Sequence, residues 1–163
     1  MKQLPYIQTS TAIIGYSDSV IAKNERNDCF VRAVASSFDC SYDTAHSWVK
    51  EKFQRVNRKG TMNVVSKMRK MCDDKEQFVD KSVKSIEGLG EIAYKFIPMN
   101  GICRPKPRIK RTTLNQFIIK YPTGVYLLIV KGHAFTLKNG AVIGNEQDSK
   151  SIKKNIYNAF EIC

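Results

Sequence analysis

The sequence predicts an α+β fold in which N-terminal helices pack on a C-terminal antiparallel sheet. Apolar residues recur at helical spacing between residues 28 and 71, whereas the last forty residues contain short apolar runs separated by glycine-containing turns. Helices that precede strands are typical of α+β proteins rather than of alternating βαβ units. With 163 residues, 42% of them hydrophobic, the chain is expected to form a single domain over residues 1–163.

Three helices are expected in the first half of the chain, after an irregular or strand-like segment over residues 1–24. The first helix begins after Asp28, a favourable N-cap, so that Cys29 lies in its first turn. The second begins after Ser41 and the third after Gly60-Thr61. Each helix is expected from an apolar stripe on one face. The stripes are Val31, Val34, Ala35 and Phe38; Tyr42, Ala45, Val49 and Phe53; and Val64, Val65, Met68 and Met71.

The middle of the chain is polar and strongly basic. Residues 73–91 are expected to be mostly loop and residues 92–97 a strand. Residues 104–111 are expected to form a proline-broken loop, and five of these eight residues are cationic. The whole chain carries 27 Lys and Arg against 15 Asp and Glu, which favours contact with a polyanion. Residues 104–111 are therefore a candidate contact for nucleic acid or an acidic partner.

A short helix and a run of strands are expected after the basic loop. Thr112 or Thr113 caps the helix, and residues 121–124 end it. Strands are expected over residues 125–130, 133–137 and 141–145, with a hairpin turn at Asn139-Gly140, and a final strand within residues 155–162.

Cys29 and His133 are the residues best suited to chemistry. A thiol at a helix N-terminus faces unpaired N–H groups and the positive end of the helix dipole, both of which favour the thiolate. A neighbouring histidine accepts the thiol proton and later protonates the leaving group. His133 opens a predicted strand, where it is placed to meet the start of the helix. His46, on the second helix, is expected to be a partly exposed helix residue.

A third group is needed to orient the imidazole, and the hairpin register decides which it is. A two-residue turn at Asn139-Gly140 pairs His133 with Glu146, whereas a three-residue loop pairs it with Asn145. Asn145 is preferred, with Glu146 and Asp148 as substitutes if the register shifts. The oxyanion site is expected to combine the Cys29 backbone N–H with the side chain of Asn27, the nearer candidate, or Asn24.

Several short motifs follow one another in a characteristic order. They are Asn27-Asp28-Cys29-Phe30-Val31-Arg32-Ala33, Tyr42, Gly60-Thr61, Thr123-Gly124-Val125-Tyr126, Gly132-His133-Ala134 and Asn139-Gly140. Their order resembles the small papain-like cysteine peptidase-fold proteins encoded in bacteriophage genomes, over roughly residues 26–145. The chain departs from papain at Phe30, where a small residue is frequent near the cysteine, and at Lys23, where a glutamine is common. The resemblance implies a papain-like fold in which Cys29, His133 and Asn145 form a triad that hydrolyses a peptide or isopeptide bond.

The resemblance also bears on partners and location. It implies that the substrate is a protein or a peptide. It also implies that the protein is located in the host cytoplasm or in the virion. The alternative function is that of a catalytically inactive basic phage protein that binds nucleic acid or a virion or host partner. No apolar run approaches the roughly 20 residues of a membrane span, and no signal peptide is evident, so no membrane contact is expected. The five cysteines have no ligand spacing, so neither metal nor cofactor is expected.

Overall fold

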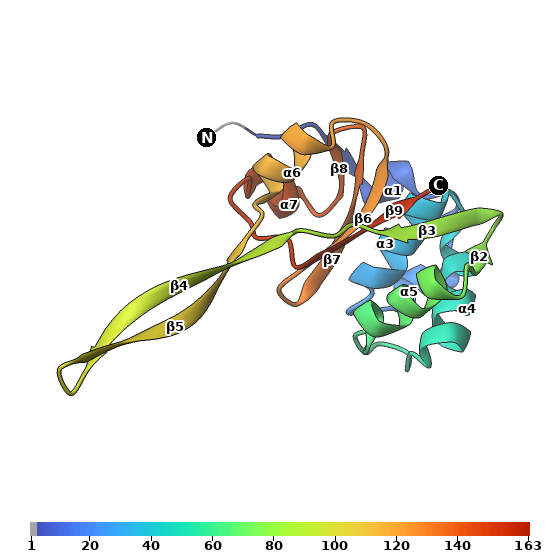
Figure 1. Ribbon diagram of the computed structural model, residues 1–163. Coiled ribbons are helices and arrows are strands. Elements are labelled where there is room, and N and C mark those ends of the chain that lie inside the picture. The colour runs from blue at the N-terminus through green and yellow to red at the C-terminus, as the bar shows by residue number, and fades with distance from the viewer. Residues whose placement is uncertain (1–2) are drawn as a thin grey trace.

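A seven-stranded sheet forms the centre of the protein. The structure, a computed structural model, describes residues 3–163, with the backbone alone at residues 92–95. The strands lie in the order β1-β8-β7-β6-β9-β3-β2, and a separate hairpin is formed by β4 and β5 (Figure 1). The strands are β1 (Tyr6–Gln8), β2 (Gln77–Phe78), β3 (Lys81–Ser85), β4 (Gly90–Met99), β5 (Ile102–Arg111), β6 (Val125–Val130), β7 (His133–Lys138), β8 (Ala141–Gly144) and β9 (Asn158–Ile162).

The α+β class is confirmed, but the sheet is neither wholly C-terminal nor wholly antiparallel. Strand β1 pairs with β8 in parallel, and β3 brings the middle of the chain to the sheet beside β9. Within residues 3–163, no helix is long and apolar enough to cross a bilayer. The helices are α1 (Thr9–Ala12), α2 (Val20–Asn24), α3 (Cys29–Phe38), α4 (Tyr42–Phe53), α5 (Val64–Asp73), α6 (Leu114–Lys120) and α7 (Glu146–Lys150).

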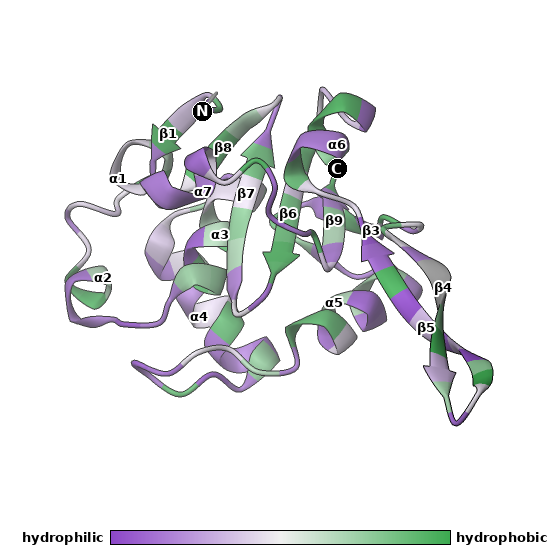
Figure 2. Ribbon diagram, turned by 90° about the vertical axis from the view of Figure 1, so that its left-hand side faces the viewer, coloured by the Kyte–Doolittle hydropathy of each residue, from purple (hydrophilic) through white to green (hydrophobic). Residues whose placement is uncertain are grey.

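Helices cover both faces of the sheet, because alternate residues of the central strands are apolar on opposite sides. On one face, Leu127 of β6 joins the core formed with α3, α4 and α5. On the other face, Leu128 of the same strand packs with Leu114 and Phe117 of α6. Figure 2 shows β8, β7, β6 and β9 side by side, with β6 apolar along most of its length. The sheet is thus buried on both sides at its centre.

Helix α3 forms where the apolar spacing predicts it and presents Cys29 in its first turn. Asp28 occupies the N-cap position as expected, but its carboxylate is used elsewhere. It accepts a hydrogen bond from the Tyr42 hydroxyl at 2.7 Å and forms an ion pair with Arg32 at 3.2 Å. The helix ends at Asp39, which adopts the left-handed conformation. Asp28 therefore ties the start of α3 to α4.

Polar contacts fix α3 on the sheet. The Thr136 hydroxyl of β7 donates to the Ala33 carbonyl of α3 at 2.9 Å and lies 2.7 Å from the Ser36 hydroxyl. Thr136 is fully buried, and Ser36 is 3% exposed. A buried polar group without a hydrogen-bond partner costs free energy. These hydrogen bonds therefore favour a single position of α3 along β7.

Two expectations for the middle of the chain are wrong. Residues 73–91 are not mostly loop, because β2 and β3 form there and join the main sheet. Residues 104–111 are not a loop but belong to β5, which pairs with β4 along its whole length. The expected strand over residues 92–97 lies inside β4. Proline disfavours strands because it lacks a backbone N–H. It is tolerated here because the prolines occupy positions whose N–H would not take part in the hydrogen bonds between β4 and β5.

The preferred register of the β7–β8 hairpin is also wrong. Lys138 pairs with Ala141, so the turn contains two residues, not three. Asn139 and Gly140 both have positive φ, 48° and 78°, which is the type I′ geometry that closes a two-residue hairpin. Strand β8 ends at Gly144, and the unexpected helix α7 follows it.

A buried ionic cluster holds the segment that precedes Cys29. Glu25 accepts hydrogen bonds from the Arg55 guanidinium at 2.6 Å, from the Arg58 backbone N–H at 3.0 Å and from His46 at 3.0 Å. His46 is therefore buried, contrary to expectation, because it has this partner. Burial raises the pKa of Glu25, but the hydrogen bonds from Arg55, the Arg58 backbone and His46 outweigh burial and bring it to about 2.

Replacing Glu25 with glutamine is expected to lower the free energy of unfolding by roughly 3–5 kcal/mol, because buried Arg55 loses its counter-charge. Urea unfolding at pH 7 measures the effect. Because the folded pKa is depressed, the wild-type advantage is complete above the ordinary pKa of 4.5 and fades as the pH falls toward 2. Glu51→Gln, at an exposed position of α4, is the control and is expected to change stability by less than about 0.5 kcal/mol. Equal losses in both variants would contradict the assignment.

Candidate active site

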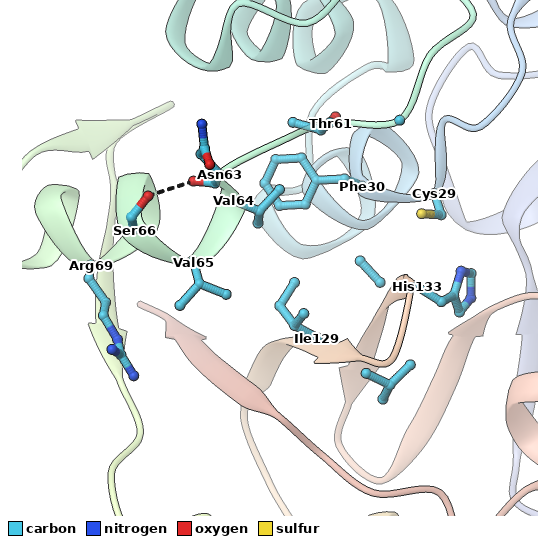
Figure 3. Close-up of a pocket in the computed structure, with 14 residues that line it drawn as sticks. Cys29, Phe30, Thr61, Asn63, Val64, Val65, Ser66, Arg69, Ile129 and His133 are labelled. Atoms are coloured by element: carbon cyan, nitrogen blue, oxygen red, sulfur yellow. Dashed lines mark hydrogen bonds between the residues drawn. The ribbon is translucent and has the colours of Figure 1, made fainter.

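Cys29 and His133 meet where α3 begins and β7 begins. Both residues line the same end of a cleft (Figure 3), close enough for each to shift the pKa of the other. Ala134, the next residue of β7, lines the cleft beside them. The structure thus brings together the cysteine and the histidine that the sequence pairs. Gly132 has a φ of 67° in the turn that leads into β7, which a residue with a side chain rarely adopts.

The electrostatics of the pair favour a thiolate and an imidazolium. Burial raises the pKa of the Cys29 thiol, but hydrogen bonds from His133 and Ala134 and the charges of His133 and Arg32 outweigh burial and lower it. The hydrogen bond to Asp148 is the main cause that raises the pKa of His133, followed by the hydrogen bond to Cys29, and the value reaches about 9. Each partner therefore stabilises the charged form of the other near neutral pH.

Asp148 is the residue that orients His133. Its Oδ2 accepts a hydrogen bond from His133 Nε2 at 2.9 Å, which leaves Nδ1 for the sulfur. The carboxylate is 2% exposed and is held by Lys154 at 2.8 Å and by the Asn145 backbone N–H at 3.0 Å. Burial raises the pKa of Asp148, but the hydrogen bonds from His133 and Lys154 outweigh burial and lower it, so the carboxylate stays ionised.

A close backbone approach at Gly144 makes room for this carboxylate. A Cβ at position 144 would lie 2.9 Å from Asp148 Oδ2 and 3.0 Å from the Cβ of Phe135. A side chain there would push Asp148 away from the imidazole. Glycine at the end of β8 is thus a condition for the contact between Asp148 and His133.

Asn145, the preferred orienting residue, forms no hydrogen bond with His133 among the described residues. Its side-chain oxygen accepts a hydrogen bond from Arg32 at 3.1 Å, and its backbone N–H donates to the Asp148 carboxylate at 3.0 Å. The strand pairing that would have set Asn145 opposite His133 does not form, because β8 ends at Gly144. Asp148 was among the substitutes, and the pattern Asn145-Glu-Gln-Asp148 is the sequence signal for it: an N-cap residue followed by an acid three positions later.

Neither asparagine expected at the oxyanion site is turned toward Cys29. Asn27 is exposed, and its side-chain amide donates to the Arg58 carbonyl at 3.2 Å. The Asn24 amide donates to the Val20 carbonyl at 3.0 Å. The Cys29 backbone N–H belongs to the first turn of α3, where the N–H groups have no intrahelical acceptor.

A cleft of about 600 Å³ opens beside Cys29. Its walls are mainly apolar. Gly60 and Thr61 also line it, and Thr61 lies above Phe30 in the view of Figure 3. Arg69 lies at the end of the cleft away from Cys29 (Figure 3). The apolar wall residues are Phe30, Val64, Val65, Ile129, Val130 and Ala134. The sequence predicts Val64 and Val65 only as part of an apolar helix stripe, and no pattern in it marks them as cleft walls.

Comparison with known proteins gives no relative. No protein-family model, no curated protein and no solved structure matches the chain. Among residues 3–163, no three His, Cys, Asp or Glu side chains are grouped as a metal site. A function is therefore inferred from the geometry around Cys29.

Cys29 is expected to react with iodoacetamide at pH 6 much faster than Cys103, because His133 stabilises its thiolate and Cys103 lies exposed on β5. Peptide mass spectrometry of one protein sample measures both cysteines, so Cys103 is an internal control. In His133→Ala the rate at Cys29 is expected to fall at least about 10-fold at pH 6, while the rate at Cys103 stays constant. A rate at Cys29 that does not depend on His133 would contradict the ion pair.

Asp148→Asn is expected to slow the alkylation of Cys29 near neutral pH, because the imidazolium loses its main stabilising partner. The pKa of His133 falls, and the pH at which the pair loses its proton falls with it. The rate of alkylation between pH 4 and pH 10 measures this shift. Asn145→Ala is the matched control and is expected to leave the profile within about 0.3 pH units. If Asn145→Ala shifts the pH profile of alkylation more than Asp148→Asn does, Asn145 and not Asp148 orients His133.

Proposed function

We propose that the protein is a thiol hydrolase that cleaves a peptide or isopeptide bond through Cys29, His133 and Asp148. The single observation that carries the proposal is the placement of the Cys29 thiol beside the imidazole of His133, which is itself hydrogen-bonded to the buried carboxylate of Asp148. A structural cysteine needs no such partners, since a buried thiol behaves as a small apolar side chain. An activated nucleophile needs both a base and a group that orients the base.

The reaction proceeds in two halves. The Cys29 thiolate attacks the carbonyl carbon, and the Cys29 backbone N–H donates to the oxyanion that forms. The His133 imidazolium then gives its proton to the leaving amine, the carbon–nitrogen bond breaks, and a thioester remains on Cys29. His133, now neutral, takes a proton from water as the water attacks the thioester. The acid leaves, and the thiolate and the imidazolium are restored.

The apolar cleft is suited to apolar side chains of the substrate. We assign it to the acyl part, which precedes the cleaved bond. Its volume lies within the range of sites that bind small molecules and short peptide segments. The Thr61 hydroxyl oxygen is buried in the wall and has no hydrogen-bond partner among the described residues. It is available to a polar group of the substrate backbone, because a buried hydroxyl gains from a partner.

The proposed fold is papain-like, and its support is the sequence resemblance to phage-encoded papain-like peptidases together with the order of the catalytic groups. The cysteine opens a helix on one side of the cleft, and the histidine opens a strand on the other. The orienting group departs from the asparagine implied by the resemblance. A host cytoplasmic or virion location belongs to the same proposal. The same groups also support acyl transfer to an amine in place of water.

A library of fluorogenic peptides with an apolar residue before the cleaved bond tests the proposal. Wild-type protein is expected to cleave at least one, and Cys29→Ser and His133→Ala are expected to lower kcat/KM at least about 10³-fold. The rate is expected to fall above about pH 9, where His133 loses its proton. Cys40→Ser is the matched control, since Cys40 is buried away from the cleft and should leave kcat/KM unchanged. Cleavage that survives Cys29→Ser would overturn the proposal.

A further inference from the structure

The β4–β5 hairpin extends away from the rest of the protein as a two-stranded arm (Figure 1). Its strands pair from Gly90 and Arg111 at the base to Met99 and Ile102 at the tip. Ten residues per strand at about 3.3 Å each give an arm about 33 Å long. No described residue of this arm lines the cleft beside Cys29.

One face of β5 is cationic along almost the whole arm. Arg104, Lys106, Arg108 and Lys110 occupy alternate positions of the strand, so their side chains lie on the same face. All four are exposed, and none forms an ion pair with another part of the chain that the structure describes. The only acidic residue of the arm is Glu91, which lies across from Lys110. The arm therefore carries a row of positive charge that the protein itself does not neutralise.

Several cations outside the arm have acidic partners. Arg55 is paired with Glu25, and Lys154 is paired with Asp148. Lys81 and Lys138 both pair with Asp39. The row on β5 differs from these pairs, because four cations share one face of a strand and none of the four has such a partner in the described part of the chain. It is a local concentration of charge on an element that has no core of its own.

The prolines of the arm show which surface is available to a partner. Pro98, Pro105 and Pro107 all belong to one alternating set of cross-strand pairs. Residues of the set that is not hydrogen-bonded across the ladder turn their N–H groups to the outside, so prolines there cost no ladder bond. They also remove donors from the outer edges, which disfavours the addition of another strand. A partner must therefore approach a face of the arm rather than an edge.

We propose that the β4–β5 arm binds double-stranded DNA with its cationic face. The major groove of B-form DNA, about 12 Å wide, accepts a two-stranded β-ribbon. The length of the arm is close to one turn of B-form DNA, about 34–36 Å. Successive cations on the face lie about 6.6 Å apart, which is close to the rise of two phosphates of one strand along the helix axis, at about 3.4 Å each. The row is thus comparable to one turn of a duplex in length and to this rise in spacing.

The opposite face of the arm explains why a duplex is preferred to a membrane. Phe96, Pro105 and Ile109 lie on that face and are exposed. A bilayer that took up these apolar side chains would leave the cations on the side turned away from the lipid headgroups. A duplex engages the cations directly, and the release of counterions from its phosphates supplies the binding free energy.

Fluorescence anisotropy with a labelled 24-base-pair duplex tests the proposal. In the variant Arg104→Ser/Lys106→Ser/Arg108→Ser/Lys110→Ser, affinity at 0.1 M salt is expected to fall at least about 100-fold. The slope of log K against log salt is expected to become shallower by about 3.6, or about 0.9 per lost phosphate contact. The thermal unfolding midpoint is expected to stay constant, because all four side chains are exposed.

The matched control is Lys23→Ser/Lys50→Ser/Lys75→Ser/Lys120→Ser, which removes the same charge from exposed positions outside the arm. It is expected to retain duplex affinity within about 5-fold. Equal losses in both variants would overturn the arm as the site, and so would no loss in the arm variant. Equal or tighter binding of single-stranded DNA of the same length, or arm-dependent binding to phosphatidylserine vesicles that exceeds duplex binding, would overturn the duplex as the partner. Because the arm variant retains Cys29 and His133, its peptide cleavage is a separate readout, and failure of either proposal leaves the other standing.

Discussion

The placement of α3 along β7 determines whether the candidate site exists. The hydrogen bond from the Thr136 hydroxyl to the Ala33 carbonyl fixes the position of α3 along β7 at the level of these two residues. From that level, Cys29 is one turn of helix away, about 6 Å, and His133 is three strand residues away, about 10 Å. Both displacements lead to the same end of the sheet. A slip of one residue along β7 would move the imidazole by about 3.4 Å, more than a hydrogen bond tolerates.

The orienting carboxylate depends on a different part of the chain, so the site needs two independent conditions. Asp148 reaches the imidazole because β8 stops early and α7 turns back across its end. Gly144 leaves the space for that approach, and Lys154 supplies the counter-charge that makes burial of the carboxylate tolerable. The packing of α3 on the sheet thus determines the position of the nucleophile Cys29. The point at which β8 ends determines the orientation of its base, His133.

The sequence was a good guide where structure is local. The apolar spacing of residues 31–38 predicted α3, and a thiol at its start with a histidine opening a strand predicted the pair. It failed where long-range pairing decides. Pro105 and Pro107 indicated a loop, but pairing with a strand formed by residues 90–99 accommodates them. The choice of Asn145 over Asp148 rested on a three-residue hairpin loop, whereas the turn contains two residues and the strand ends at Gly144, and no periodicity in the sequence shows either.

The two ends of the β4–β5 arm meet at Gly90 and Arg111, and Thr112 donates to the Leu89 carbonyl immediately below them. The segments that enter and leave the arm are therefore neighbours with or without it. Such a hairpin behaves in evolution as an insertion into a closed domain: it can lengthen, shorten or change its sequence without altering the packing beneath Cys29. Related chains could share the thiol site and differ entirely in what this position recognises.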